Sequence, residues 1–180
     1  SVWINSLILS AGGTVITNNT AGRNATVTID SAAGKAAAGV IQELAHSSAA
    51  SPSLSSDMEE QGRAEFEGSG GGFLLNWPYV WAAAQADIKD GSRPASLLSD
   101  IGWARYPQVA SGEPSVPPYG GIDLGISKYG THQSDALAAV ECITSAANQA
   151  AYMIASGNPA AKASVYDDPA VKKAFPMASV

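Results

Sequence analysis

A proline-rich segment, SGEPSVPPYGG at residues 111–121, divides the chain. Proline lacks a backbone N–H and fixes its own φ, so Pro114, Pro117 and Pro118 exclude both a helix interior and a central strand here. The stretches on either side are therefore expected to belong to different parts of the fold, with this segment crossing between them.

Helical and strand patterns alternate on both sides of the crossing. Before it, the patterns predict four helices, a hairpin and two strands: helices over 2–11, 31–47, 57–67 and 78–88, a hairpin from 14–17 and 25–30, and strands over 72–76 and 101–109. After it, they predict a strand over 122–127, a long helix over 133–156, and short helices near 159–166 and 169–174. Strands separated by helices favour an α/β architecture.

Apolar residues at helical spacing predict the buried faces of two of these helices. In helix 31–47 the face consists of Val40, Ile41 and Leu44. In helix 133–156 it consists of Leu137, Val140, Ile143 and Ala147.

Composition and charge narrow the classes of function. Hydrophobic residues make up 46% of the chain and charged residues only 14%, which is enough apolar material for a core. A formal net charge of −6 argues against nucleic-acid binding, which needs a basic face. His46 and His132 have no partners at metal-ligand spacing, and Cys142 falls within an apolar helical pattern. Neither a metal nor a cofactor is expected.

An aromatic cluster follows the strand predicted over 72–76. Asn76, Trp77, Pro78 and Tyr79 occupy consecutive positions. A sugar ring has an apolar C–H face and a rim of hydroxyl groups, which an aromatic ring and a polar side chain can match. The cluster is therefore a candidate sugar site, while composition alone favours packing of the rings in a core.

Acidic residues in helix 57–67 suggest a different class of function. Glu59 or Glu65 could serve as the acid or base of a saccharide-acting enzyme, because glycoside hydrolysis uses a pair of carboxylates. Such residues in the first turns of a helix are ordinarily a solvated face that complements the helix dipole. A structural or adhesive surface protein without a small ligand is the third class.

The segment EEQGRAEFEGSGGGFLLNWPYVW resembles the extracellular sugar-binding proteins of bacterial ABC importers, especially the trehalose/maltose-binding branch with its mycobacterial trehalose-binding lipoproteins. LILSAGGTVI, DSAAGKAAAGVIQEL and YGGIDLGISK are similar to further stretches of the same family. The resemblance implies an α/β, periplasmic-binding-protein-like fold (type II), in which two lobes enclose a ligand cleft.

The resemblance also implies a domain organisation. Residues 1–116 would form part of the second, C-terminal lobe, 117–124 the hinge crossing, and 125–180 part of the first, N-terminal lobe. Family members are about twice as long, so this sequence is expected to be an internal portion. Part of the sugar site would then lie elsewhere. Residues 125–180 are expected to be poorly ordered alone or to pack on another chain.

Individual site residues follow from the family motif. Tyr79 matches the position at which the family stacks an aromatic ring on sugar, and Trp77 and Asn76 are its neighbours in the motif. The resemblance implies two further pairs of site residues. Gly120 and Gly121 match the crossing loop of the family, and Trp3 and Asn5 lie at the start of the second-lobe segment.

The function implied is that of a binding protein, not an enzyme. It would capture a disaccharide, trehalose before others, by closing its lobes, and would then dock on a membrane permease of the ABC type. Such a protein acts outside the cytoplasm, at the cell surface or in the periplasm, and is expected to be lipid-anchored when whole.

Overall fold

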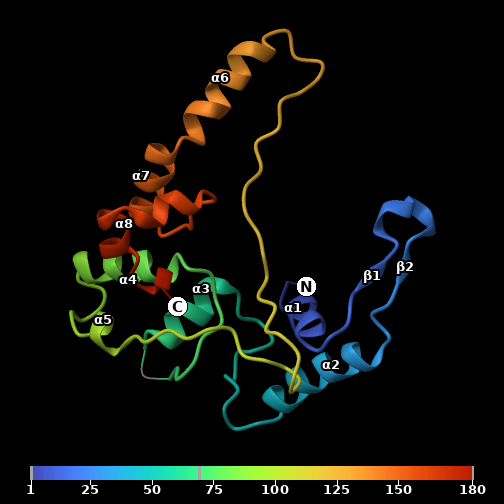
Figure 1. The fold of residues 1–180 in the computed structure, drawn as a ribbon. Coiled ribbons are helices and arrows are strands. Elements are labelled where there is room, and N and C mark those ends of the chain that lie inside the picture. The colour runs from blue at the N-terminus through green and yellow to red at the C-terminus, as the bar shows by residue number, and fades with distance from the viewer. Residues whose placement is uncertain (1, 69, 180) are drawn as a thin grey trace. The chain divides into compact units, whose positions relative to one another are not determined.

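The computed structural model of the protein describes residues 2–68 and 70–179. They form two compact units (Figure 1). Unit 1 comprises Ser1–Ser56 with Arg105–Gly121, and unit 2 comprises Asp57–Ala104 with Ile122–Val180. Each unit is therefore built from two stretches that are separated in the sequence. The boundary between Gly121 and Ile122 falls inside the segment predicted to cross between lobes, whereas residues 57–104 group with 122–180. The lobe assignment itself stays a prediction.

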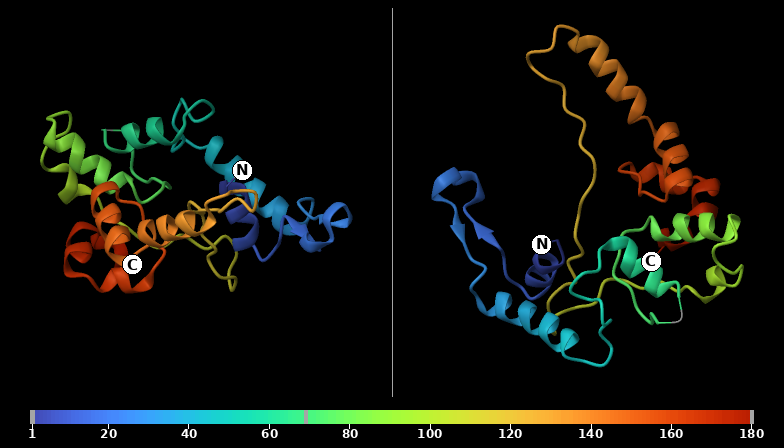
Figure 2. Two further views of the ribbon diagram at one scale, coloured as in Figure 1. Left: turned by 90° about the horizontal axis from the view of Figure 1, so that it is seen from above. Right: turned by 180° about the vertical axis from the view of Figure 1, so that it is seen from behind.

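In unit 1, helix α1 (Val2–Ser10) packs on helix α2 (Ala32–Ala45). Ser31 begins α2 as its N-cap, because its hydroxyl accepts a hydrogen bond from the backbone N–H of Gly34 at 3.1 Å. Between the helices, β1 (Ile16–Thr17) and β2 (Thr26–Val27) pair antiparallel around the short helix η1 (Asn19–Asn24). This hairpin projects beyond both helices (Figure 2).

The predicted buried face of α2 is wrong. Val40, Ile41 and Leu44 are 41%, 45% and 49% exposed, whereas Gly34 and Ala37 are buried. Helical spacing places Gly34, Ala37, Ile41 and Leu44 on one stripe, and only the first two of these are buried. The covered half carries small residues, which allow the chain to approach closely.

Gly34 shows how close this approach is. A Cβ there would lie 1.8 Å from the carbonyl oxygen of Ile29, while a Cβ at Gly39, on the same helix, would meet nothing within 4 Å. We expect Gly34→Ala to lower the free energy of unfolding by about 1–3 kcal/mol through overpacking. Gly39→Ala should raise it by up to about 1 kcal/mol, because alanine is the better helix former. Urea unfolding followed by circular dichroism measures both. Equal effects of the two substitutions would contradict the packing described.

Two buried serines of α1 attach the second stretch of unit 1. The backbone N–H of Val116 donates to Ser10 Oγ at 2.9 Å, and both Ser6 and Ser10 donate their hydroxyls to the Val116 carbonyl. Trp3 stacks on Tyr106, with 6.3 Å between ring centroids and 6° between the planes. The proline-rich segment is thus held against α1 by specific contacts.

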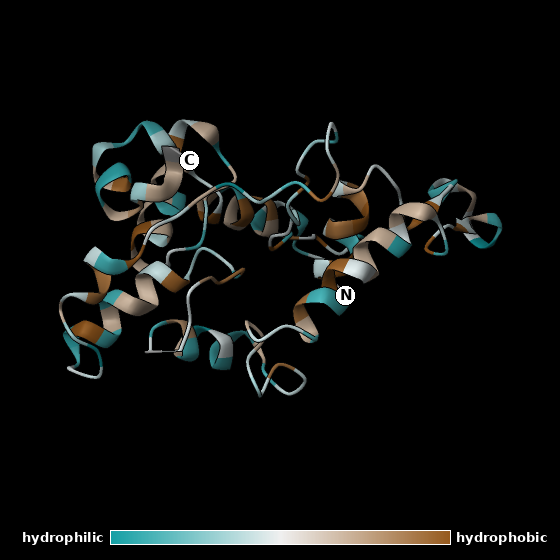
Figure 3. Cartoon of the chain, turned by 90° about the horizontal axis from the view of Figure 1, so that it is seen from below, coloured by the Kyte–Doolittle hydropathy of each residue, from teal (hydrophilic) through white to brown (hydrophobic). Residues whose placement is uncertain are grey.

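Unit 2 is helical in its described residues. Its elements are α3 (Glu59–Phe66), α4 (Val80–Lys89), α5 (Leu97–Asp100), α6 (Gln133–Ile143), α7 (Ala146–Ser156), η2 (Ala163–Asp167), α8 (Pro169–Ala174) and η3 (Pro176–Ser179). Met153, Val165, Val171 and Phe175 form its buried core, and α7 also contacts α4. In Figure 3 hydrophobic and hydrophilic residues are mixed along the longer helices. None of the described helices has the length and hydropathy needed to span a bilayer.

The long helix predicted over 133–156 is interrupted. Thr144 turns its hydroxyl back to the Val140 carbonyl at 2.8 Å, and Ser145 adopts an extended conformation as the N-cap of α7. Hydroxyl side chains compete in this way with the helical backbone bonds. Along the predicted apolar face, Leu137 and Ile143 are 50% and 58% exposed, so no described residue covers them fully.

The strands predicted over 72–76, 101–109 and 122–127 are not formed in the described residues, where β1 and β2 alone pair. A strand needs a neighbour to satisfy its backbone groups, and no strand among the described residues pairs with these segments. Their apolar side chains accordingly remain outside the core: Phe73 is 101% and Ile122 85% exposed.

Candidate ligand-binding site

The aromatic cluster lies in the turn that leads into α4. The side-chain oxygen of Asn76 accepts a hydrogen bond from the Trp77 backbone N–H at 2.7 Å, and its amide donates to the Glu59 carbonyl at 3.0 Å. Asn76 therefore ties the turn to the start of α3, although no strand precedes it. Trp77 and Tyr79 are both partly buried.

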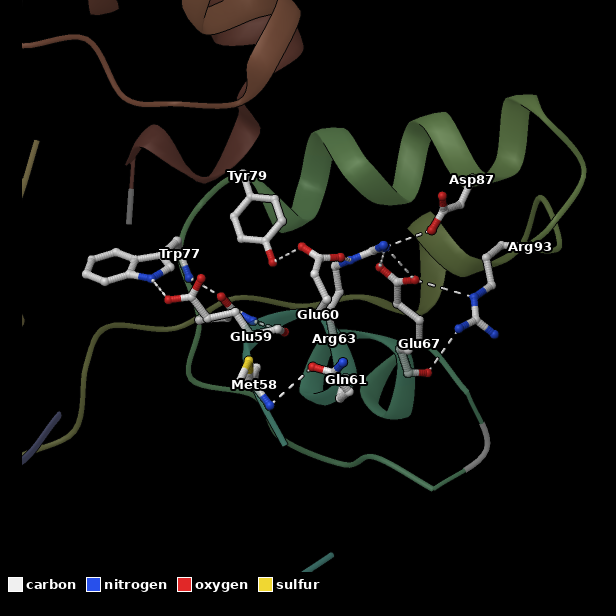
Figure 4. A network of polar contacts seen from close by, with 12 residues as sticks. Met58, Glu59, Glu60, Gln61, Arg63, Glu67, Trp77, Tyr79, Asp87 and Arg93 are labelled. Carbon is white, nitrogen blue, oxygen red and sulfur yellow. Dashed lines mark hydrogen bonds and ion pairs between the residues drawn. The ribbon is translucent and has the colours of Figure 1, made fainter. Parts of the chain in front are cut away.

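The first turn of α3 meets both rings (Figure 4). The indole N–H of Trp77 donates to Glu59 Oε1 at 2.7 Å, and the phenolic hydroxyl of Tyr79 donates to Glu60 Oε1 at 2.6 Å. Two carboxylates and two aromatic rings from separate segments of the chain are thus brought together at one place.

A network of ion pairs fixes α3 against α4. Arg63 donates from Nε to Glu60 at 3.1 Å, and from Nη1 to Glu67 at 2.8 Å and to Asp87 of α4 at 2.7 Å. The Glu67 side chain is fully buried and also pairs with Arg93 at 3.4 Å. Buried charges are tolerated when they are paired and hydrogen-bonded in this way.

These contacts change the acidity of the paired groups. Burial, together with the bond to Glu60, raises the pKa of Tyr79 to about 12. The hydrogen bonds from Tyr79 and Arg63 lower the pKa of Glu60 below its ordinary value of 4.5. At neutral pH the phenol therefore keeps its proton while the carboxylate is ionised.

The end of α7 supports the backbone at Tyr79. Gly157 caps α7 with a φ of 71° and is buried. A Cβ at Gly157 would lie 2.9 Å from Ala82 Cβ and 3.2 Å from Tyr79 Cα. Only glycine combines this left-handed backbone with such a close approach.

Four of the predicted site residues belong to the other unit. Trp3 and Asn5 lie on α1, and Gly120 and Gly121 lie in an extended, exposed stretch of unit 1. A pocket of about 490 Å³ adjoins Tyr106, the stacking partner of Trp3, and its other lining residues are Arg105, Gln108, Ser115 and Pro117. The structure thus brings together Asn76, Trp77 and Tyr79, and the role of all seven residues in binding stays a prediction.

The sequence does not reveal that residues of α3 hold the rings. Glu60, Arg63 and Glu67 are spaced to share one face of α3, which was a readable signal. Asp87 lies 24 positions after Arg63, and no local sequence pattern indicates that the two residues meet. Glu59 and Glu65, the pair considered for an enzyme, point about 120° apart around α3, as six helical residues require. No cluster able to hold a metal ion occurs within 2–68 and 70–179.

Comparisons with known proteins relate the chain to two binding proteins. No protein-family model matches the chain. A probable ABC transporter-binding protein of Deinococcus radiodurans is 33% identical over 120 residues, which are 66% of this chain and 27% of that protein. The structure of maltose-bound MalE3 of T. maritima matches with a TM-score of 0.72 and 27% identity over 97% of this chain and 42% of that one.

Two expectations are settled by these relatives. The chain is homologous to an ABC transporter-binding protein, and the type II periplasmic-binding-protein fold is confirmed by the match to MalE3. Both relatives are binding proteins rather than enzymes. The chain spans about a quarter of the length of the first relative and under half of the second.

Proposed function

We propose that this chain is part of the substrate-binding component of an ABC importer, and that it captures a disaccharide, trehalose before others, for delivery to a membrane permease. The observation that carries the proposal is the pairing of Trp77 and Tyr79 with the carboxylates of Glu59 and Glu60. It occurs in a chain that shares its fold with a maltose-bound protein.

The chemistry of the site suits a sugar. Aromatic rings pack against the apolar C–H face of a pyranose, while carboxylate and phenolic oxygens accept hydrogen bonds from its hydroxyl groups. The ion pairs behind the rings hold them before the ligand arrives, so little ordering has to accompany binding. Such a site binds its ligand by contact and leaves it chemically unchanged.

The remaining parts of the proposal concern the whole protein. Gly120, Gly121, Trp3 and Asn5 would add contacts from the crossing and from the lobe that contains α1. Ligand would favour a closed arrangement of the lobes, because it gains contacts with both. The protein would work outside the cytoplasm and would be held there by a lipid anchor.

Truncation of the rings tests the sugar site. In the whole protein, Tyr79→Ala or Trp77→Ala should weaken binding by about 1–3 kcal/mol, or roughly 5- to 150-fold in Kd, because a buried aromatic contact is lost. Titration calorimetry with trehalose and with maltose measures this. Tyr152→Ala, at a 55% exposed tyrosine of α7, is the matched control and should leave Kd unchanged. If the variants fold and bind sugar with unaltered affinity, both rings only pack within the protein and do not contact the ligand.

Product analysis separates binding from catalysis. After prolonged incubation, trehalose and maltose should be recovered intact. Release of glucose that Glu59→Gln or Glu65→Gln abolishes would instead establish the saccharide-acting enzyme.

A further inference from the structure

The Tyr79 hydroxyl has one proton, and Glu60 accepts it. We infer that Glu60, held by Arg63, is a positioning residue that makes the Tyr79 oxygen a hydrogen-bond acceptor, so that the site selects ligands that present a hydroxyl donor there. The choice of ligand rests on the proposed function, whereas the orientation of Tyr79 does not.

The direction of the bond follows from the two groups. An ionised carboxylate has no hydrogen to donate, so the proton in the 2.6 Å contact must come from Tyr79. Once this proton is committed, the phenolic oxygen can only accept further hydrogen bonds. Bonds of this kind to a charged group are shorter and stronger than neutral ones, which keeps the hydroxyl from turning toward a ligand.

Glu60 is itself prevented from turning away. Its second oxygen accepts from Arg63 Nε at 3.1 Å, and Arg63 is anchored on both sides, by the buried Glu67 at the C-cap of α3 and by Asp87 of α4. Because α4 begins directly after Tyr79, the helix that carries the ring also anchors the arginine that holds its partner. Orientation is therefore built into the ligand-free protein.

The surroundings reinforce the same polarity. The indole N–H of Trp77 is already donated to Glu59, and the neighbouring Arg63 donates to Glu60, Glu67 and Asp87, so these N–H groups are engaged within the protein. A sugar hydroxyl can satisfy such a site by donating its proton. An O-methyl group at the same position has lost that proton and leaves the Tyr79 oxygen unpaired, which costs affinity.

Affinities for modified sugars test the inference in the whole protein. Calorimetry would compare trehalose, maltose and their singly O-methylated derivatives in the wild type, Glu60→Gln, Tyr79→Phe and the control Glu141→Gln, an exposed residue of α6. We expect about 10-fold discrimination against methylation at one position in the wild type and in Glu141→Gln. It should be lost in Tyr79→Phe and fall several-fold in Glu60→Gln, whose neutral amide no longer fixes the phenol. Undiminished discrimination in Glu60→Gln overturns the inference.

A measurement without ligand separates this inference from the sugar-binding proposal. With tyrosine labelled at ¹³Cζ, the resonance of Tyr79, assigned by its absence in Tyr79→Phe, should shift in Glu60→Gln and stay in place in Glu141→Gln. The other tyrosines should not move, which shows that the fold is intact. If neither sugar binds the wild type, the proposed ligand is wrong, and the Tyr79 resonance still decides whether Glu60 orients the phenol. A resonance unaffected by Glu60→Gln overturns that orientation.

Discussion

Replacing Arg63 with alanine should lower the free energy of unfolding by about 3–5 kcal/mol, which is the range for breaking a buried ion pair from one side. The substitution leaves Glu67, whose side chain is fully buried, without one of its two cationic partners, and it removes the bond to Asp87 between α3 and α4. Arg63→Lys keeps the charge but cannot bridge three carboxylates with one planar group, so we expect an intermediate loss.

Urea unfolding followed by tryptophan fluorescence measures the effect, because Trp77, Trp81 and Trp103 all lie in unit 2. The matched control is Arg23→Ala, which removes the same charge from the exposed hairpin turn of unit 1 and should change stability by less than about 0.5 kcal/mol. If Arg63→Ala were as stable as the control, the network would be a surface feature, and the rings would need another explanation for their placement.

Phe175→Ala should be comparably damaging. Phe175 is 5% exposed and packs with Met153, Val165 and Val171, so truncation leaves a cavity where α7, η2 and α8 meet. Loss of a buried phenylalanine ring costs about 3–5 kcal/mol, as transfer and cavity contributions add.

Phe73→Ala supplies the control for this core substitution. Phe73 is 101% exposed, so the same chemical change there removes no buried contact and should alter stability by about 0.5 kcal/mol or less. Equilibrium unfolding of both variants, with hydrogen exchange of α7 as a local measure, compares them directly. Similar destabilisation by the two substitutions would contradict the core described.

The helices were predictable because the information that forms them is local. The local signals are Ser31 at the start of α2, Pro169 at the start of α8, and the apolar spacing of α1 with the glycines that follow it. The sequence patterns over 72–76, 101–109 and 122–127 predict strands that the structure does not form. A strand depends on a neighbour that can lie anywhere in the chain, so a local pattern cannot establish it. The break between α6 and α7 at Ser145 has a local signal, the adjacent hydroxyl residues Thr144 and Ser145. The apolar pattern continues through them and predicts one unbroken helix.

The candidate site divides in the same way. Asn76, Trp77 and Tyr79 stood out because polar and aromatic residues were concentrated around one proline. The acidic residues of α3 are visible in the sequence as well, but as a separate feature that suggests a solvated face or a catalytic role. That Glu59 and Glu60 bond to these rings depends on contacts across 18 and 19 positions, which no local pattern encodes.

The bonds between α1 and Val116 have a consequence for the order of assembly. Ser6 and Val116 are 110 positions apart, and the first stretch of unit 2 is synthesised between them. Contacts with such a large sequence separation form slowly, because the intervening loop must close before they contribute. During synthesis α1 emerges long before its partner exists, and its two serines stay hydrated until the proline-rich segment arrives. Unit 1 is therefore completed only after residues 57–104 have left the ribosome.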